Sequence, residues 1–224
     1  MSIAEETALK VAEFLLQIKA IKLNPRQPYK WASGWLSPIY CDNRITLSHP
    51  KIRTYIRQRF TDQINEDFGN VDAIAGVATA GIPQGVLVAQ ELGLPFAYVR
   101  SEAKGHGMSN LIEGELKQGA RIVVVEDLIS TGKSSLNAIS ALREAGYEII
   151  GLISIFNYGF SIATENFKNA NCKFVSLSNY DTLIKQALNT GYITESDMDS
   201  LNAWKENPEN WGKVIENFDE SHSL

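Results

Sequence analysis

Two adjacent carboxylates follow an apolar run in the segment VVVEDLISTGKSS, residues 123–135. An ionised carboxylate only accepts hydrogen bonds, so Glu126 and Asp127 could each accept one from a hydroxyl of a vicinal diol, such as that of a ribose. Small hydroxyl residues then lead from Ser130 into a predicted helix, whose free N–H groups and dipole favour a phosphate monoester. The spacing predicts a site for a sugar phosphate.

A nucleotide-triphosphatase loop is disfavoured in the same segment, although it contains Gly-Lys-Ser. The P-loop pattern requires a glycine five positions before the glycine that precedes lysine. Counting back from Gly132 reaches Asp127, whose negative charge would face the phosphate. A plainer alternative is a solvated turn in which Ser134 or Asp127 caps the helix. This alternative explains the serines but not two acids directly behind three valines.

A second candidate segment gathers basic groups in a glycine-containing loop. Arg100, Lys104 and His106 lie there with Gly105 and Gly107. Such a loop gains little from packing, so its charges are expected to act when it closes over a bound anion. The alternative is a solvated basic loop.

Two further segments could contact a substrate. In GVATAGIP, residues 76–83, the small residues around Thr79 would let backbone N–H groups approach phosphate oxygens, and a tight strand-to-helix turn fits the same residues. Nearer the N-terminus, Ser33, Gly34 and Arg44 could contact a planar carboxylate, with Arg44 as its bidentate partner. Pairing of Arg44 with Asp42 as scaffolding is equally compatible with the sequence.

The elements that would position these residues alternate from residue 71 onward between short apolar runs and helical segments. This alternation predicts an α/β fold with a mostly parallel sheet, in which ligands bind beyond the carboxyl ends of the strands. The expected strands are Ala73–Val77, Phe96–Arg100, Arg121–Val125, Ile149–Phe156 and Lys173–Ser176, and the expected helices are Ile82–Leu92, Ser134–Ala145, Phe160–Phe167 and Tyr180–Asn189.

The flanking segments predict further elements. Apolar spacing favours an amphipathic helix over Glu5–Ala20, and two short strands about a turn are expected within Tyr29–Tyr40. Pro50 should open another helix. A capping-box pattern precedes a tail helix over Glu195–Lys205, and Pro208 should open a last short segment. Trp204 and Trp211 in this tail are expected to be packing anchors.

Composition restricts the class of protein. A chain of 224 residues fits one domain, and a net charge of -5 argues against a broad grip on nucleic acid or anionic lipid. Cys41 and Cys172 suit thiols in a reducing compartment. The acidic N-terminus and the lack of a long apolar stretch lead us to expect a cytoplasmic protein without membrane association.

The segment VVVEDLISTGKSS resembles the signature of the type I phosphoribosyltransferases. Three further segments, in the expected order, are similar to the orotate branch of that family: YKWASGWLSPIYCDNR (29–44), GVATAGIP (76–83) and YVRSEAKGHG (98–107). The resemblance implies the type I phosphoribosyltransferase fold as a single domain, with residues 1–48 contributing an N-terminal hood and residues 71–180 the core sheet. It also implies a homodimer with shared active sites.

The resemblance implies transfer of the 5-phosphoribosyl group from phosphoribosyl pyrophosphate to orotate, which gives orotidine 5′-phosphate and pyrophosphate in pyrimidine biosynthesis. Catalysis would fall to Arg100, Lys104 and His106, with Mg²⁺ held mainly through the substrate. Phosphoribosyl pyrophosphate would contact these three residues together with Thr79, Glu126, Asp127, Leu128, Ile129, Ser130, Thr131, Gly132, Lys133 and Ser134, and orotate would contact Ser33, Gly34, Arg44 and Ser130.

The chain departs from many relatives at several basic positions. Ala32, Ala80 and Ser101 stand where lysines are common, and Asn157 begins a segment where an orotate-contacting arginine is common. Lys30 and Lys133 are candidates to supply the missing charge. A purine phosphoribosyltransferase and a regulatory protein that senses phosphoribosyl pyrophosphate remain as alternative functions.

Overall fold

A six-stranded sheet forms the centre of the protein. The structure is a computed structural model that describes residues 2–31, 33–102 and 111–212. The strands lie in the order β10-β9-β8-β5-β6-β7, and every neighbouring pair is parallel except β6 and β7. Their bounds are β5 Ala73–Val77, β6 Phe96–Val99, β7 Ile112–Glu113, β8 Arg121–Ile129, β9 Glu148–Asn157 and β10 Phe174–Asn179. This arrangement is the α/β fold with a central, mostly parallel sheet that the sequence predicts.

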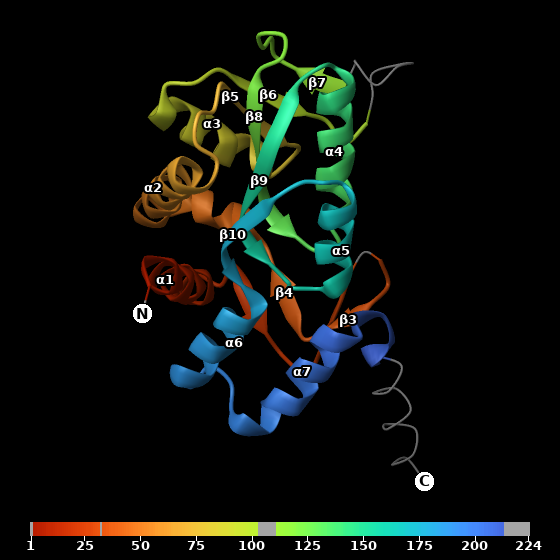
Figure 1. The fold of residues 1–224 in the computed structure, drawn as a ribbon. Helices are drawn as coiled ribbons and strands as arrows, with labels where there is room; N and C mark the ends of the chain where they lie inside the picture. The colour runs from red at the N-terminus through yellow and green to blue at the C-terminus, as the bar shows by residue number, and fades with distance from the viewer. Residues whose placement is uncertain (1, 32, 103–110, 213–224) are drawn as a thin grey trace.

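Helices cover both faces of the sheet (Figure 1). On one face lie α4 and α5, and their apolar residues pack on Ile122 and Val124 of β8. On the other face α1, α2 and α3 pack with Val123 and Val125, so the valines of β8 alternate between two cores. The helices are α1 Ile3–Gln17, α2 Pro50–Asp67, α3 Gly81–Leu92, α4 Lys133–Glu144, α5 Ser161–Asn169, α6 Tyr180–Asn189 and α7 Met198–Glu206, the last behind the 3-10 turn η3 Glu195–Asp197.

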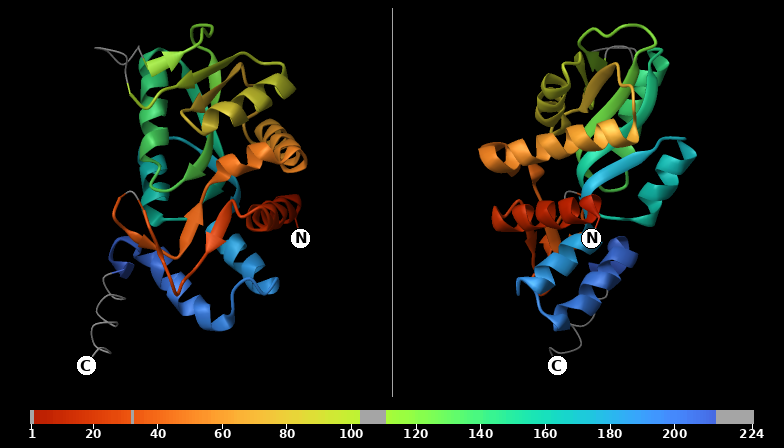
Figure 2. Two further views of the ribbon diagram at one scale, coloured as in Figure 1. Left: turned by 180° about the vertical axis from the view of Figure 1, so that it is seen from behind. Right: turned by 60° about the vertical axis from the view of Figure 1, so that its left-hand side comes forward.

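The N-terminal segment builds a small antiparallel layer next to α7 (Figure 2). It contains β1 Ile21–Leu23 paired with β4 Ile39–Cys41, and β2 Tyr29–Lys30 paired with β3 Leu36–Ser37. A 3-10 helix, η1 Asn43–Ser48, leads into α2. From here on we use the name hood for residues 20–31 and 33–48, which form this layer and are part of the 1–48 segment that the resemblance assigns to an N-terminal hood. Trp31 of the hood packs on Tyr158 and Trp204, with ring centroids 5.2 Å and 5.7 Å away.

Most expected elements are confirmed within a few residues. The strand β5 and the helix α6 have the predicted bounds, Pro50 opens α2, and Thr194 and Asp197 form the capping box. Trp204 and Trp211 are buried, as expected of packing anchors. Both cysteines are free thiols. The strand β8, which begins at Arg121, is longer than predicted, because it continues through Glu126 and Asp127 to Ile129.

Candidate functional site

The candidate site lies where the strand order reverses. The chain proceeds from β5 outward to β6, whereas β8 returns to the other side of β5 and is followed by β9 and β10. At such a switch point the loops that follow two neighbouring strands diverge and leave a crevice at their carboxyl ends. The turn after β5 and the acids at the end of β8 meet there, as the sequence predicted for ligand-binding segments.

Glu126 is a buried acid, with 5% of its surface exposed. Both of its oxygens are engaged by the chain: Oε1 accepts from the backbone N–H of Asp127 at 3.0 Å, and Oε2 accepts from the Ser135 hydroxyl of α4 at 3.2 Å. Burial, followed by the neighbouring charge of Asp127, raises the pKa of Glu126 well above its ordinary value. Glu126 therefore joins the Asp127 backbone to α4.

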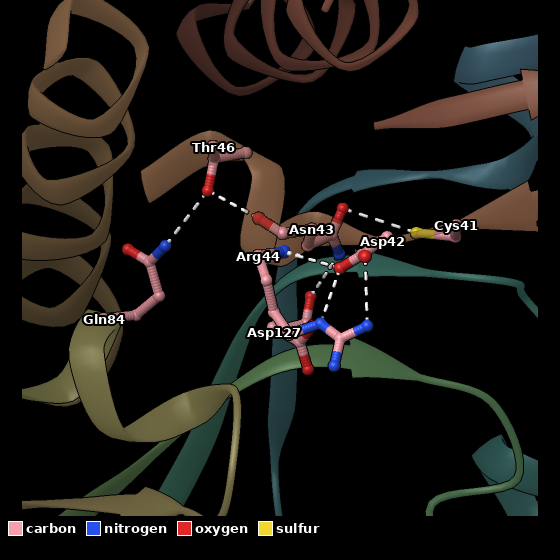
Figure 3. A network of polar contacts seen from close by, with 7 residues as sticks. All are labelled: Cys41, Asp42, Asn43, Arg44, Thr46, Gln84 and Asp127. Atoms are coloured by element: carbon pink, nitrogen blue, oxygen red, sulfur yellow. Dashed lines mark hydrogen bonds and ion pairs between the residues drawn. The ribbon is translucent and has the colours of Figure 1, made fainter. Parts of the chain in front are cut away.

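Asp127 is more open than Glu126, with a half-buried side chain. Its carboxylate lies on the hood side of β8, near the guanidinium of Arg44 (Figure 3). Burial raises the pKa of Asp127, while the positive charge of Arg44 opposes that rise. The two acids therefore serve different sides of the strand, as the alternation of side chains along β8 requires.

The turn after β8 ends in a helix that no side chain caps. Gly132 is the N-cap of α4 in the left-handed conformation, with φ 80°, and makes no side-chain cap hydrogen bond. The alternative in which Ser134 or Asp127 caps this helix is therefore wrong. The carbonyl of Thr131 accepts a 3.0 Å hydrogen bond from the side-chain amide of Asn166 on α5, which holds the turn in place. Backbone N–H groups at this N-terminus remain suited to an anion.

The turn after β5 is shaped by close backbone packing. A Cβ at Gly81 would collide with the carbonyl oxygen of Val125, and one at Gly76 would lie 2.8 Å from the Gly81 oxygen. Glycine is therefore required here for α3 to approach the sheet. Thr79 is exposed in this turn, its peptide bond to Ala78 is cis, and Pro83 lies in the first turn of α3 as expected. Ala80 is the N-cap of α3 and makes no cap hydrogen bond.

A cavity of about 970 Å³ opens beside the turn after β8. It is large enough for a sugar carrying several phosphates. Leu128, Arg100 and Ser101 contribute to its wall, and Arg100 lies 3.4 Å from a carboxylate oxygen of Glu113. The residues of the turn that line it are Ser130, Thr131, Gly132, Lys133, Ser134 and Ser135. Lys133 is exposed there, whereas Lys104 and His106 lie outside the described residues.

In the hood, Arg44 already has an acidic partner. Its Nε lies 2.6 Å from one carboxylate oxygen of Asp42, and its second guanidinium nitrogen lies 3.0 Å from the other. This side-chain hydrogen bonding lowers the pKa of Asp42. The side chain of Arg44 is nevertheless 63% exposed, so part of its guanidinium faces solvent. Ser33 and Gly34 are exposed in the turn between β2 and β3, where Gly34 has φ 89°.

Sequence reasoning missed a polar network that connects the hood to the sheet (Figure 3). The side-chain amide of Asn43 donates to the backbone carbonyl of Asp127 at 2.8 Å. The Thr46 hydroxyl donates to the Asn43 carbonyl at 2.6 Å and accepts from the Gln84 amide of α3 at 3.2 Å. Asn43 and Asp127 lie 84 positions apart, and Thr46 and Gln84 lie 38 positions apart, so no local pattern connects them. The signal available in the sequence was the run of polar residues after β4.

The segment after β9 lacks a cation. Asn157 ends β9 and is half-buried, and Tyr158 is 3% exposed and stacks on Phe160. Burial raises the pKa of Tyr158 well above its ordinary value. In the described ranges, no group of three or more His, Cys, Asp or Glu side chains could hold a metal ion. No helix in these ranges is long and apolar enough to cross a membrane.

Comparison with known proteins identifies close relatives. Residues 47–190 match the family model of the phosphoribosyl transferase domain. An orotate phosphoribosyltransferase from Bacteroides thetaiotaomicron is 58% identical over 200 residues, which cover 89% of this chain and 94% of the relative. A protein of the same name from Cytophaga hutchinsonii is 54% identical over 91% of this chain and 98% of its own length.

Solved structures agree with this similarity. The crystal structure of orotate phosphoribosyltransferase from Aeropyrum pernix superposes with a TM-score of 0.72 at 29% identity, over 82% of this chain and 99% of that one. A Leishmania donovani UMP synthase gives a TM-score of 0.75 at 26% identity and covers 88% of this chain and 42% of its own.

Proposed function

The chain belongs to the phosphoribosyltransferase family, in its orotate branch, and we propose that its crevice at the ends of β5 and β8 binds phosphoribosyl pyrophosphate for transfer to orotate. The products are orotidine 5′-phosphate and pyrophosphate. The observation that carries the proposal is the half-buried carboxylate of Asp127 beside an uncapped helix N-terminus. An oxygen acceptor suited to a ribose hydroxyl and N–H groups suited to a phosphate are therefore separated by only a few residues of chain.

The sugar phosphate would lie across the end of β8. Asp127 accepts hydrogen bonds from the ribose hydroxyls, and Glu126 supports it from the buried side through the Asp127 N–H. Backbone N–H groups of residues 131–134 and the hydroxyls of Ser130, Thr131 and Ser134 hold the 5-phosphate. Lys133, which lines the cavity, supplies positive charge close to this phosphate.

Orotate would enter between the hood and the turn after β8. Its carboxylate needs a cation. Arg44 belongs to the hood, and its guanidinium lies near the Asp127 carboxylate. Binding then requires Arg44 to share its guanidinium between Asp42 and the substrate, which its five N–H donors allow. Ser33, Gly34 and Ser130 supply neutral contacts around the ring. Asn157 cannot supply the charge that an arginine would.

The reaction displaces pyrophosphate from the anomeric carbon by the orotate nitrogen. Positive charge develops on the sugar ring, so the Asp127 carboxylate beside the ring would stabilise the transition state. Negative charge collects on pyrophosphate, which the exposed turn at Thr79 and the guanidinium of Arg100 would receive. Lys104 and His106 are proposed to act on the same leaving group.

Magnesium fits this site as a companion of the substrate. The cavity wall carries the hydroxyls of Ser130 and Thr131, and the half-buried Asp127 carboxylate precedes them at the end of β8. Oxygen is the ligand class that Mg²⁺ prefers. When bound with pyrophosphate oxygens, the ion supplies positive charge to the leaving group. We propose that it is held mainly through the substrate.

We propose a homodimer in which each subunit completes the other's site. This proposal rests on the resemblance of residues 98–107 to a segment that reaches the neighbouring subunit in the family. We also propose a cytoplasmic location, which the two free thiols support.

The decisive test is the loss of orotate absorbance when the protein is mixed with orotate, phosphoribosyl pyrophosphate and magnesium. Adenine, hypoxanthine and uracil serve as parallel substrates, and turnover of a purine base in place of orotate would support the alternative function. Lys104→Ala should reduce turnover far more than it reduces stability. Equal turnover of this variant would remove Lys104 from the proposed machinery.

A further inference from the structure

The end of β8 is unpaired on one side. The pairing of β8 with β5 ends at Gly76 opposite Val125, whereas its pairing with β9 continues to Ile129 opposite Asn157. Within the described chain, the residues of β8 after Val125 therefore have no strand partner on the β5 side. Asp127 lies in this half-paired segment, where fewer ladder hydrogen bonds fix the backbone.

Side chains, in place of a neighbouring strand, form hydrogen bonds with the backbone N–H and C=O groups of Asp127. Its N–H donates to Glu126 Oε1 at 3.0 Å, and its carbonyl accepts from Asn43 Nδ2 at 2.8 Å. Two groups of the Asp127 backbone are thus bonded to side chains of the site. The direction of the Asp127 side chain depends on this clamp, because a rotation of either peptide unit would turn its Cα–Cβ bond.

The side-chain amide of Asn43 is held in the orientation that this contact requires. The residue is 1% exposed, and its Oδ1 accepts a hydrogen bond from the Cys41 thiol at 3.3 Å. Only one orientation of the amide satisfies both partners, since the carbonyl of Asp127 requires a donor and the thiol can donate to the oxygen. The amide is therefore fixed before any ligand arrives.

The same residue is connected to the segment that follows β5. The backbone carbonyl of Asn43 accepts from the Thr46 hydroxyl, which accepts from Gln84 on the first turns of α3 (Figure 3). Arg44, the proposed orotate cation, is the next residue in the chain. Asn43 thus lies among three segments that the proposed reaction uses.

We infer that Asn43 is a positioning residue for phosphoribosyl transfer: its side-chain amide holds the Asp127 carbonyl, so that the Asp127 carboxylate faces the ribose hydroxyls. This role rests on the proposed function, and Asn43 itself touches no substrate in it. Loss of the Asn43 amide would leave the Asp127 carbonyl unpaired. The backbone at the end of β8 could then rotate. The effect should fall on the sugar substrate and much less on orotate.

The test replaces Asn43 with leucine, which has the same number of side-chain heavy atoms and no donor. Binding of phosphoribosyl pyrophosphate with magnesium is measured by calorimetry, and the KM values of both substrates are measured by the orotate assay. We expect about ten-fold weaker binding of phosphoribosyl pyrophosphate, equivalent to about 1.4 kcal/mol, and a KM for orotate within about two-fold of the parent. Unchanged binding in a folded variant, or an equal change in both KM values, would overturn the inference.

A double-mutant cycle with Asp127→Ala shows whether Asn43 acts through the acid. On this background Asn43→Leu should change the affinity for phosphoribosyl pyrophosphate by less than about two-fold, because no carboxylate remains to be aimed. A loss that persists at full size would contradict the inference.

Ser178→Ala is the matched structural control. Ser178 is fully buried and donates to the Ala8 carbonyl at 2.8 Å, so its loss also removes a bond between distant segments. We expect lower stability and unchanged substrate constants, and an equal loss of sugar binding would refute a specific role for Asn43. If Asn43→Leu does not fold, Asn43→Asp keeps the shape and removes the donor. If neither folds, Asn43 is a structural residue and the inference fails.

Orotate consumption by the unaltered protein separates this inference from the proposed function. If the parent binds phosphoribosyl pyrophosphate but does not consume orotate, the proposed function fails. Weaker binding by Asn43→Leu would still support the positioning role in that case.

Discussion

Gly132→Ala should damage the phosphate turn by two separable effects. Gly132 has φ 80°, a conformation that costs an L-residue roughly 1–2 kcal/mol. A Cβ there would also lie 2.6 Å from Cε2 of Phe167, well inside the ordinary contact distance. Phe167 is 1% exposed and packs on Phe174 with ring centroids 4.4 Å apart, so its ring cannot simply turn away.

The two effects add to a substantial loss. Overpacking of a filled core costs about 1–3 kcal/mol, so the total destabilisation expected for Gly132→Ala is about 2–5 kcal/mol. If the turn shifts to relieve the collision, the N–H groups of α4 move away from the phosphate. Affinity for phosphoribosyl pyrophosphate should then fall as well.

Gly191→Ala isolates the backbone effect. Gly191 has φ 70° and nothing within 4 Å of an added Cβ, so alanine there should cost only the conformational 1–2 kcal/mol or so. Urea denaturation gives the free energy of unfolding of each variant, and calorimetry gives the affinity. If Gly132→Ala were no less stable than Gly191→Ala and bound phosphoribosyl pyrophosphate normally, the described geometry of the turn would be refuted.

Three further predictions concern the acids, the turn and the subunits. Because burial and Asp127 raise the pKa of Glu126, this acid favours the folded state most below its unfolded pKa, and that contribution is lost as pH rises through the folded pKa. Glu126→Gln should therefore be more stable than the parent near neutral pH in thermal denaturation, yet bind phosphoribosyl pyrophosphate more weakly; a less stable variant would contradict this. Asn166→Leu removes the donor to the Thr131 carbonyl and should weaken phosphate binding by about five-fold to thirty-fold in calorimetry, whereas unchanged affinity would exclude Asn166 as the support of the turn. Mixing inactive Lys104→Ala and Asp127→Ala subunits should restore about a quarter of the parent activity if a homodimer shares its sites, and no recovery after subunit exchange would exclude sharing.

The sequence predicted the position of β8 and of the turn after it well, because local patterns determine both. Three valines in a row are typical of a central strand that is buried on both faces, so they place β8, and the hydroxyl turn after it places the start of α4. The roles of Glu126 and Asp127 were less predictable, since they depend on how far β8 continues. Once the strand extends to Ile129, neighbouring side chains serve opposite faces, and one acid meets α4 while the other meets the hood.

Contacts between distant segments could not be predicted. Asn43 and Asp127 are separated by 84 positions, and Asn166 and Thr131 by 35, so no local periodicity links either pair. The pairing of β1 with β4 was also missed, because three residues are too few to show alternation. These contacts hold the segments of the site in place. The segments themselves could be predicted from the sequence.

A crystal structure with phosphoribosyl pyrophosphate and magnesium would test the central claim most directly. We predict an Asp127 carboxylate oxygen within about 2.5–3.0 Å of a ribose hydroxyl, and the 5-phosphate on the backbone N–H groups at the start of α4. A ligand bound elsewhere, with the Asp127 carboxylate turned to solvent and the turn after β8 empty, would contradict the assignment.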